Sequence, residues 1–237
     1  MKIMLANPRG FCAGVNMAIE CVERVLQLKG APIYVYHEIV HNSHVVGALR
    51  DKGAVFVQEL ADIPEGAVAI LSAHGVAPEV VKEARQRSLR LIDATCPLVT
   101  KVHLEVHRFV ARGYFIILIG HRGHDEVVGT LGEAPGRIVL VEDEEQARTV
   151  EVPSHEKLTV ITQTTLGVDD TAGVLRVLRD RFPTAGVFLP ETFTVTMYSP
   201  LSWKMYCPFL FFSKIVRPFA AAMKIVLLGQ WIPKTSK

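Results

Sequence analysis

Short apolar runs alternate with helical patterns along most of the chain, and this alternation limits the possible folds more than any other feature. Seven runs rich in β-branched and aromatic residues are expected as strands, over residues 2–6, 33–40, 68–73, 90–94, 114–120, 137–141 and 158–162. Helical patterns follow most of them, over about 13–29, 44–53, 78–87, 97–113, 126–131, 143–150 and 168–182. Continuous apolar strands separated by helices are typical of parallel sheets covered on both faces. The chain is therefore predicted to be an α/β protein.

The same pattern predicts more than one lobe. A chain of 237 residues is long enough for one to two domains, and the long helical pattern that begins at residue 97 suggests a division near residue 96. We expect a first parallel-sheet α/β lobe over 1–96 and a second over 97–183. Residues 184–237 form a tail of different character, which we expect to be irregular.

The composition of this tail separates it from the rest of the chain. It holds six basic residues and one acid, Glu191, together with ten of the 18 aromatic residues, whereas residues 1–183 hold 20 Lys and Arg against 23 Asp and Glu. Its basic residues leave uncharged runs of about ten residues, short of the roughly 20 that a membrane-spanning helix needs. No transmembrane segment is predicted. A basic, aromatic helix lying on a membrane is the alternative that we favour less.

The four cysteines indicate a reducing compartment. Cys12, Cys21, Cys96 and Cys207 are too few and too scattered for a secreted disulfide framework. The opening residues contain an apolar run too short for a signal peptide, so a cytoplasmic protein is predicted. Cys21 lies in the middle of a helical pattern and is interpreted as a core residue.

Polar side chains gather where the predicted strands end. In parallel α/β sheets, ligands bind beyond the carboxyl ends of the strands. The residues that follow these ends are Cys12, His41, His74, Cys96, His121, His124, Glu126, Gln163, Thr164 and Thr165. If both lobes turn these ends inward, thiols, imidazoles, hydroxyls and a carboxylate converge on one cavity.

Cys12 and Cys96 each precede a predicted helix. Thiols at helix N-termini ionise readily, and a thiolate is both a nucleophile and a soft metal ligand. The alternative is a buried, inert cysteine. No zinc motif, dinucleotide fingerprint or phosphate-binding loop is present. Soft thiolates on separate loops suit an iron–sulfur cluster better than zinc.

The histidines after the strands indicate an anion site. His41, His74 and His124 each lie before a turn or helix start, where imidazoles and backbone N–H groups can bind phosphate. Each taken alone could equally be a structural residue. His103 and His107 are spaced as metal ligands on one helix, but without partners they are interpreted as surface or packing residues.

Glu126 and the two threonines leave several roles open. Glu126 could donate a proton in general acid catalysis, or it could simply stabilise the start of its helix. Thr164 and Thr165 could cap the following helix, relay protons or bind substrate oxygens.

Six motifs in this sequence closely resemble those of 4-hydroxy-3-methylbut-2-enyl diphosphate reductase, the iron–sulfur enzyme of the last step of the non-mevalonate isoprenoid route. They are ANPRGFCAGV (6–15), HEIVHN (37–42), SAHGV (72–76), DATCPLVTKVH (93–103), GHRGHDEVVGT (120–130) and TQTTLGVDDT (162–171). The motifs occur in the family's order and cover essentially residues 1–183.

The resemblance implies a three-lobed α/β architecture around a [4Fe–4S] cluster held by three cysteines. It implies reductive removal of the substrate hydroxyl, giving isopentenyl and dimethylallyl diphosphate, with electrons from a ferredoxin- or flavodoxin-type donor. The partners expected are this allylic diphosphate and the electron donor, with no nucleic acid.

The resemblance also implies a role for each matching residue. Cys12 and Cys96 correspond to cluster ligands, and Glu126 corresponds to the proton donor with Thr164 as its partner. The residues implied to bind the diphosphate are His41, His74 and His124. Thr164 and Thr165 are further candidates for binding substrate, from their place after a predicted strand.

The sequence departs from the family pattern after residue 183. The family continues with a segment of the type KDDICYATxNRQ, which supplies the third cysteine, and then with a third lobe. Cys207 is the only cysteine beyond this point, and its context is unrelated, so we do not expect it to be the third ligand. We expect a reductase truncated or frame-shifted after about residue 183. The alternatives are a non-catalytic remnant that binds diphosphate, and a protein that binds one metal ion through Cys12, Cys96 and a histidine.

Overall fold

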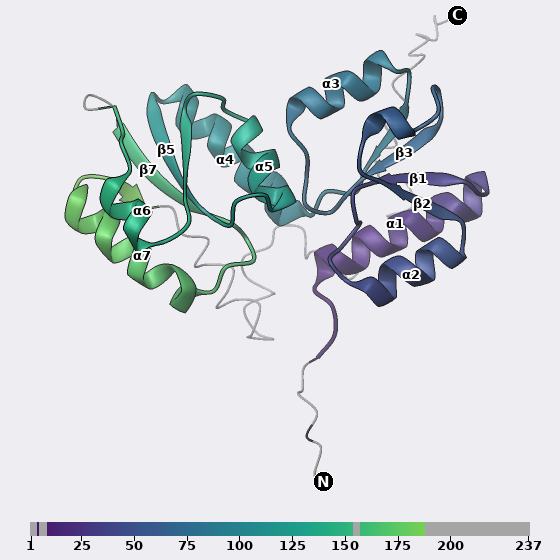
Figure 1. Ribbon diagram of the computed structural model, residues 1–237, viewed down its shortest axis with the longest axis horizontal. Coiled ribbons are helices and arrows are strands. Elements are labelled where there is room, and N and C mark those ends of the chain that lie inside the picture. Colours follow the sequence, from purple (N-terminus) through teal and green to yellow (C-terminus); the bar gives the residue numbers. More distant parts are fainter. Residues whose placement is uncertain (1–3, 5–8, 154–156, 188–237) are drawn as a thin grey trace, which may run out of the picture. The chain divides into compact units, whose positions relative to one another are not determined.

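Figure 1 shows the computed structural model, which describes residues 4, 9–153 and 157–187. The chain divides into two compact units, residues 1–101 and 102–237. The division falls inside a helix, a few residues after the boundary expected near residue 96. The strand predicted at residues 2–6 lies, except for Met4, outside the described residues.

The first unit is built on a four-stranded parallel sheet with the strand order β2-β1-β3-β4. Its elements are α1 (Ala13–Lys29), β1 (Ile33–Tyr36), α2 (Ser43–Asp51), β2 (Ala54–Val57), the short 3-10 helix η1 (Leu60–Asp62), β3 (Val68–Leu71), α3 (Pro78–Gln86) and β4 (Arg90–Asp93).

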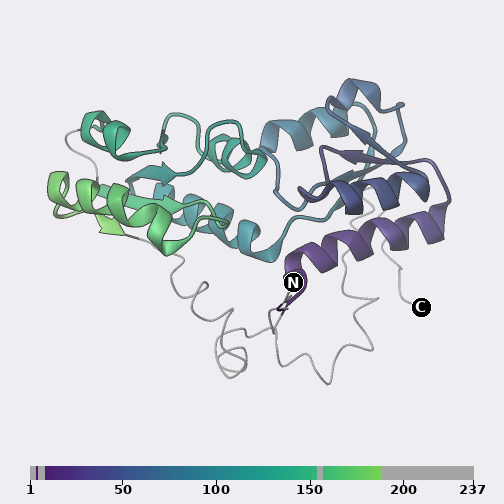
Figure 2. The same cartoon turned by 60° about the horizontal axis from the view of Figure 1, so that its bottom comes forward.

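Both faces of the first sheet are covered, because successive side chains of a strand point to opposite sides. Ile33 and Val35 of β1 pack in a core with α1 and α2. Tyr34 and Tyr36 of the same strand pack instead in a core with η1 and α3. Figure 1 shows α1 and α2 on one side of the sheet and α3 on the other, and α1 runs along its face in Figure 2.

The second unit repeats this arrangement with the strand order β6-β5-β7-β8, again all parallel. Its elements are β5 (Tyr114–Ile119), α5 (Asp125–Gly132), β6 (Ile138–Val141), α6 (Glu144–Thr149), β7 (Lys157–Thr162), α7 (Val168–Arg181) and β8 (Gly186–Val187), preceded by α4 (Pro97–Ala111), which contains the division between the units. Helices α4 and α5 cover one face of the sheet, and α6 and α7 cover the other.

The prediction of an α/β protein with two parallel sheets is confirmed, and the predicted helices lie where the structure has them. Two strands differ. The strand expected at 33–40 ends at Tyr36, because His37 has a φ of 60° and turns the backbone away. Ile39 and Val40 remain buried beyond this turn, so their apolar character reflects the core and not a strand. Strand β2, at Ala54–Val57, was not predicted.

The end of the second unit also differs from expectation. Strand β8 pairs with β7, so the sheet extends into the stretch assigned to the irregular tail. The remainder of that tail, residues 188–237, lies outside the described residues, and so does Cys207. Within the described residues, no helix is long and apolar enough to cross a membrane.

Candidate active site

Backbone hydrogen bonds join the loops at the carboxyl ends of the first sheet. The N–H of Ala73 donates to the carbonyl of Ile39 at 3.2 Å, and the N–H of Cys96 donates to the carbonyl of Ala73 at 2.9 Å. The loops that carry His41, His74 and Cys96 therefore lie next to one another at the edge where ligands bind in parallel α/β sheets.

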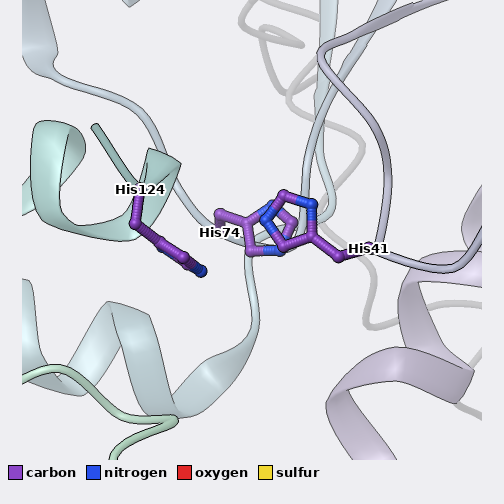
Figure 3. Close-up of side chains that lie close together, drawn as sticks. All are labelled: His41, His74 and His124. Carbon is purple, nitrogen blue, oxygen red and sulfur yellow. The ribbon is translucent and has the colours of Figure 1, made fainter. Parts of the chain in front are cut away.

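His41 and His74 stack on each other in these loops (Figure 3). Their ring centroids are 4.2 Å apart with 22° between the planes. His41 is exposed, and its Nδ1 lies 3.7 Å from a carboxylate oxygen of Glu38. Imidazole N–H groups at such an edge can donate to an anion. His124, the third side chain labelled in Figure 3, belongs to the second unit.

The two candidate cluster ligands lie at the starts of helices. Cys12 is the N-cap residue of α1, is exposed and makes no side-chain cap hydrogen bond, and Cys96 immediately precedes α4. A Cβ added at Gly14 would overlap the Sγ of Cys96. The Cys96 thiol therefore lies against Gly14 in the first turn of α1. Gly14 is two residues after Cys12 in the chain. Backbone N–H groups at helix starts favour negative charge, which suits thiolates.

Cys12 and Cys96 both belong to the first unit. Cys21 is a core residue as predicted, because it is buried among the apolar side chains under α1. Burial, followed by the charge of Asp93, raises the pKa of its thiol to about 11.

The second unit holds a buried carboxyl group at the start of α5. Glu126 is 2% exposed. Its Oε1 accepts a hydrogen bond from the backbone N–H of Thr164 at 2.7 Å, and its Oε2 is paired with the Thr164 hydroxyl at 2.8 Å. Thr164, in the loop after β7, thus contacts both oxygens of Glu126 at the start of α5.

The environment of Glu126 favours the protonated form. Burial raises the pKa of this carboxyl above its ordinary value of 4.5, and this effect outweighs the hydrogen bonds from Thr164 and the charge of His103, which lower it. A carboxyl with a raised pKa can hold a proton nearer to neutral pH and deliver it.

His124 has a defined tautomer. It is the N-cap residue of α5, and its Nδ1 accepts the N–H of Glu126 at 3.1 Å. Because an acceptor nitrogen carries no proton, the proton of the neutral ring lies on Nε2. Nε2 of His124 is therefore a hydrogen-bond donor, and a residue that binds an anion needs such a donor.

Two histidines of α4 share one carboxylate that the sequence analysis did not single out. Nδ1 of His103 lies 2.9 Å from Glu133, and Nε2 of His107 lies 2.7 Å from its other oxygen. Burial alone would raise the pKa of Glu133, but the hydrogen bonds and charges of the two histidines lower it overall. The interpretation of His103 and His107 as surface or packing residues missed this cluster of His103, His107 and Glu133, since Glu133 caps the end of another helix, α5.

Gln163, to which no role was assigned from the sequence, makes two hydrogen bonds through its side chain. It follows β7, is 2% exposed and bonds to two loops: its Oε1 accepts the N–H of His121 at 3.0 Å, and its Nε2 donates to Thr165 Oγ1 at 2.7 Å. The position of Gln163 directly after a predicted strand marked it as a candidate site residue. Its hydrogen bond with His121 could not be predicted, because the two residues are far apart in the chain.

These observations define an α/β protein with two parallel sheets of equal strand order and with ligand-type side chains after the strands. The sequence model of the family described as LytB protein matches residues 3–194. The chain belongs to this family.

Named relatives agree with this assignment. The chain is 60% identical over 183 residues to 4-hydroxy-3-methylbut-2-enyl diphosphate reductase of Rhodopirellula baltica. This alignment covers 77% of this chain and 57% of that protein. It is 57% identical over 182 residues to the reductase of Burkholderia pseudomallei, with 77% and 58% covered. The chain thus spans less than three fifths of the length of these relatives.

A solved structure shows the same fold. The E-1-hydroxy-2-methyl-but-2-enyl-4-diphosphate reductase of Plasmodium falciparum superimposes with a TM-score of 0.75 at 45% identity. The match covers 78% of this chain and 58% of that one.

Proposed function

We propose that the chain acts in the reduction of 4-hydroxy-3-methylbut-2-enyl diphosphate to isopentenyl and dimethylallyl diphosphate. In this reaction the C–O bond to the hydroxyl breaks, two electrons and two protons enter, and the oxygen leaves as water. The names of the relatives suggest the activity. The observation in this chain that carries the proposal is the buried Glu126 carboxyl paired with Thr164.

Glu126 and Thr164 form a proton path with a defined direction. A backbone N–H only donates, so Oε1 of Glu126 is always an acceptor and the carboxyl proton resides on Oε2. That oxygen is 2.8 Å from the Thr164 hydroxyl. Glu126 passes its proton to Thr164 Oγ1 while Thr164 passes its own proton to the departing oxygen. Burial keeps competing water away from the carboxyl.

The diphosphate is assigned to imidazole and hydroxyl donors. His41 and His74 stack in adjacent loops of the first unit, and His124 carries its proton on Nε2. We propose that these three residues and Thr165 bind phosphate oxygens and so hold the substrate for reaction. For the three histidines this assignment follows the resemblance of their motifs to the family, and Thr165 is included because it is exposed and follows β7.

Cys12 and Cys96 are proposed to hold an iron–sulfur cluster. The donor set fits in part: both thiols lie at helix starts in the first unit, and Gly14 leaves room for the Cys96 sulfur. Within the described residues Cys21 offers no third thiolate, because it is buried with a raised pKa. When bound, a [4Fe–4S] cluster supplies electrons and a Lewis-acidic iron. A ferredoxin- or flavodoxin-type donor and a cytoplasmic, reducing location complete the proposal.

Anaerobic reconstitution of the full chain with iron and sulfide tests the proposal. We expect a [4Fe–4S] signal in EPR spectra after reduction of the cluster with dithionite, and product formation when a reduced ferredoxin is supplied. Diphosphate binding without a cluster would contradict the reductase and support the non-catalytic alternative. Stoichiometric zinc that resists a chelator would instead support a single-metal protein.

A further inference from the structure

The two neighbouring threonines after β7 differ in what orients their hydroxyl groups. Thr164 is paired with the titratable carboxyl of Glu126. Thr165 is paired with the neutral amide of Gln163. The first partner can change its protonation state during a reaction, and the second cannot.

The orientation of the Gln163 amide is forced by its other neighbour. The backbone N–H of His121 can only donate, so the atom facing it at 3.0 Å must be the amide oxygen. The amide nitrogen then faces Thr165 Oγ1 at 2.7 Å and donates to it.

The consequence for Thr165 is a fixed hydrogen-bond polarity. Its oxygen already accepts from Gln163, so its own proton is directed to another acceptor. Among the described residues no acceptor is recorded for that proton, and Thr165 is exposed to solvent. A hydroxyl held as a donor at an exposed position selects an anionic oxygen over a donor group.

The consequence for Thr164 is the opposite. When Glu126 is ionised, the Thr164 hydroxyl donates to Oε2, and its lone pairs remain for a ligand. When Glu126 is protonated, Oε2 donates to Thr164, and the hydroxyl proton becomes available. The polarity of Thr164 therefore follows the proton on Glu126.

We propose that Gln163 is a positioning residue that holds Thr165 as a permanent donor to a phosphate oxygen of the substrate, while Thr164 alone exchanges protons. The inference rests on the proposed function and deepens it. It separates the anion-binding hydroxyl from the proton-carrying hydroxyl on adjacent residues, so that substrate charge and proton delivery do not compete for one group.

The substitution Gln163→Glu tests the polarity directly. Its ionised carboxylate would still accept the N–H of His121 but would also accept the Thr165 hydroxyl, which reverses that hydroxyl. We expect the variant to bind inorganic diphosphate about 10- to 100-fold more weakly than the wild-type chain at alkaline pH. The loss should shrink at acidic pH, where the protonated carboxyl can donate to Thr165 again.

The Thr165→Val background separates polarity from charge repulsion. In that background Gln163→Glu should cause no further loss, because no hydroxyl remains to be reversed. An equal loss in both backgrounds would show simple repulsion and overturn the inference. Unchanged diphosphate binding by Gln163→Glu at every pH would overturn it as well.

Two further outcomes keep the inference distinct from the proposed function. A wild-type chain that binds no diphosphate overturns both, whereas diphosphate binding that is unchanged by substitution of Gln163 overturns only the inference.

If Gln163→Glu does not fold, NMR of the wild-type chain tests the inference instead. We then expect a coupling across the hydrogen bond from the His121 nitrogen to the Gln163 side-chain carbonyl, and contacts from the Gln163 amide protons to the Thr165 methyl. Their absence would overturn the inference.

Discussion

The two units share one strand order but differ in the chemistry that follows their strands. In each, the second strand of the unit lies at one edge, followed by the first, third and fourth. The first unit carries the thiols of Cys12 and Cys96 at helix starts and the stacked imidazoles of His41 and His74, and of these Cys12 and His41 are exposed. After the second sheet come a buried carboxyl, a buried amide and hydroxyls, which are linked by short hydrogen bonds.

We propose that this difference reflects two tasks: the first unit supplies ligands alone, whereas the second supplies the proton donor Glu126 besides the phosphate donors His124 and Thr165. Metal and phosphate ligands need open lone pairs or N–H groups, which exposed loops provide. A proton donor needs a shifted pKa, which requires burial and fixed partners. The same sheet topology serves both, because the loops and not the strands supply the chemistry.

The largest expected effect concerns the thiols of the first unit. Cys12→Ser and Cys96→Ser should each abolish assembly of an iron–sulfur cluster, because a hydroxyl is a poor substitute for a soft thiolate. Iron and sulfide analysis after anaerobic reconstitution measures this. Cys21→Ala is the matched control, with unchanged iron content and about 1–2 kcal/mol of lost stability from the small cavity. Iron loss in Cys21→Ala alone would break the comparison.

The next effect concerns the buried carboxyl of the second unit. Glu126→Gln should lower turnover by about 10²- to 10⁴-fold, the usual contribution of a positioned acid. Steady-state kinetics at equal cluster content measures the loss.

The stability of the same variant should move in the other direction. Burial raises the folded-state pKa of Glu126, so its contribution to stability is fully present below about pH 4.5 and falls as the pH rises through the folded-state pKa. Glu126→Gln should therefore melt at an equal or higher temperature than the wild-type chain at neutral pH. A lower melting temperature at neutral pH would show that Glu126 serves the fold.

A smaller effect is expected where the first unit makes room for a sulfur. Gly14→Ala would place a methyl group on the Cys96 sulfur and should weaken iron binding by about 10-fold, as displaced ligand shells do. Gly47→Ala in α2 is the control, because a Cβ there meets nothing within 4 Å. It should gain up to about 1 kcal/mol from helix propensity and keep its iron. Equal iron binding by the two variants would contradict the placement of Cys96.

The smallest effect concerns the cluster of His103, His107 and Glu133 in the second unit. Glu133 is 10% exposed and bonds to two histidines, so Glu133→Gln should cost about 1–3 kcal/mol in urea unfolding at neutral pH. Its folded-state pKa is lowered, so this stability is present above about pH 4.5 and disappears as the pH falls through the folded-state pKa.

His107→Gln is the matched variant for this cluster. His107 is 56% exposed, and water can replace its partner. It should therefore cost less than Glu133→Gln. A larger loss for His107→Gln would contradict the picture of a buried carboxylate held mainly by His103.

The fold was largely predictable because helix and strand periods are local signals. The helices at Ala13–Lys29 and Val168–Arg181 were predicted closely. The short strand Ala54–Val57 was missed because its apolar run is only four residues long and follows closely after the end of a helix. His37 ended a strand inside an apolar run, because burial of Ile39 and Val40 gives the same pattern as a strand.

The site was predictable only residue by residue. Strand ends identified Glu126 and Thr164 as polar positions, but their pairing joins residues far apart in the chain. The same holds for Gln163 with His121 and for His103 with Glu133. Hydrogen-bond direction, which decides what each group can donate, depends on such pairs and cannot be read from one sequence.

Product analysis of a single reductive turnover tests the division of labour between the units most directly. Wild-type chain and Glu126→Gln would be loaded to the same cluster content and given 4-hydroxy-3-methylbut-2-enyl diphosphate with excess reductant. We predict isopentenyl and dimethylallyl diphosphate from the wild-type chain, and unconverted substrate from the variant. Equal product from both would contradict the assignment of proton delivery to the second unit.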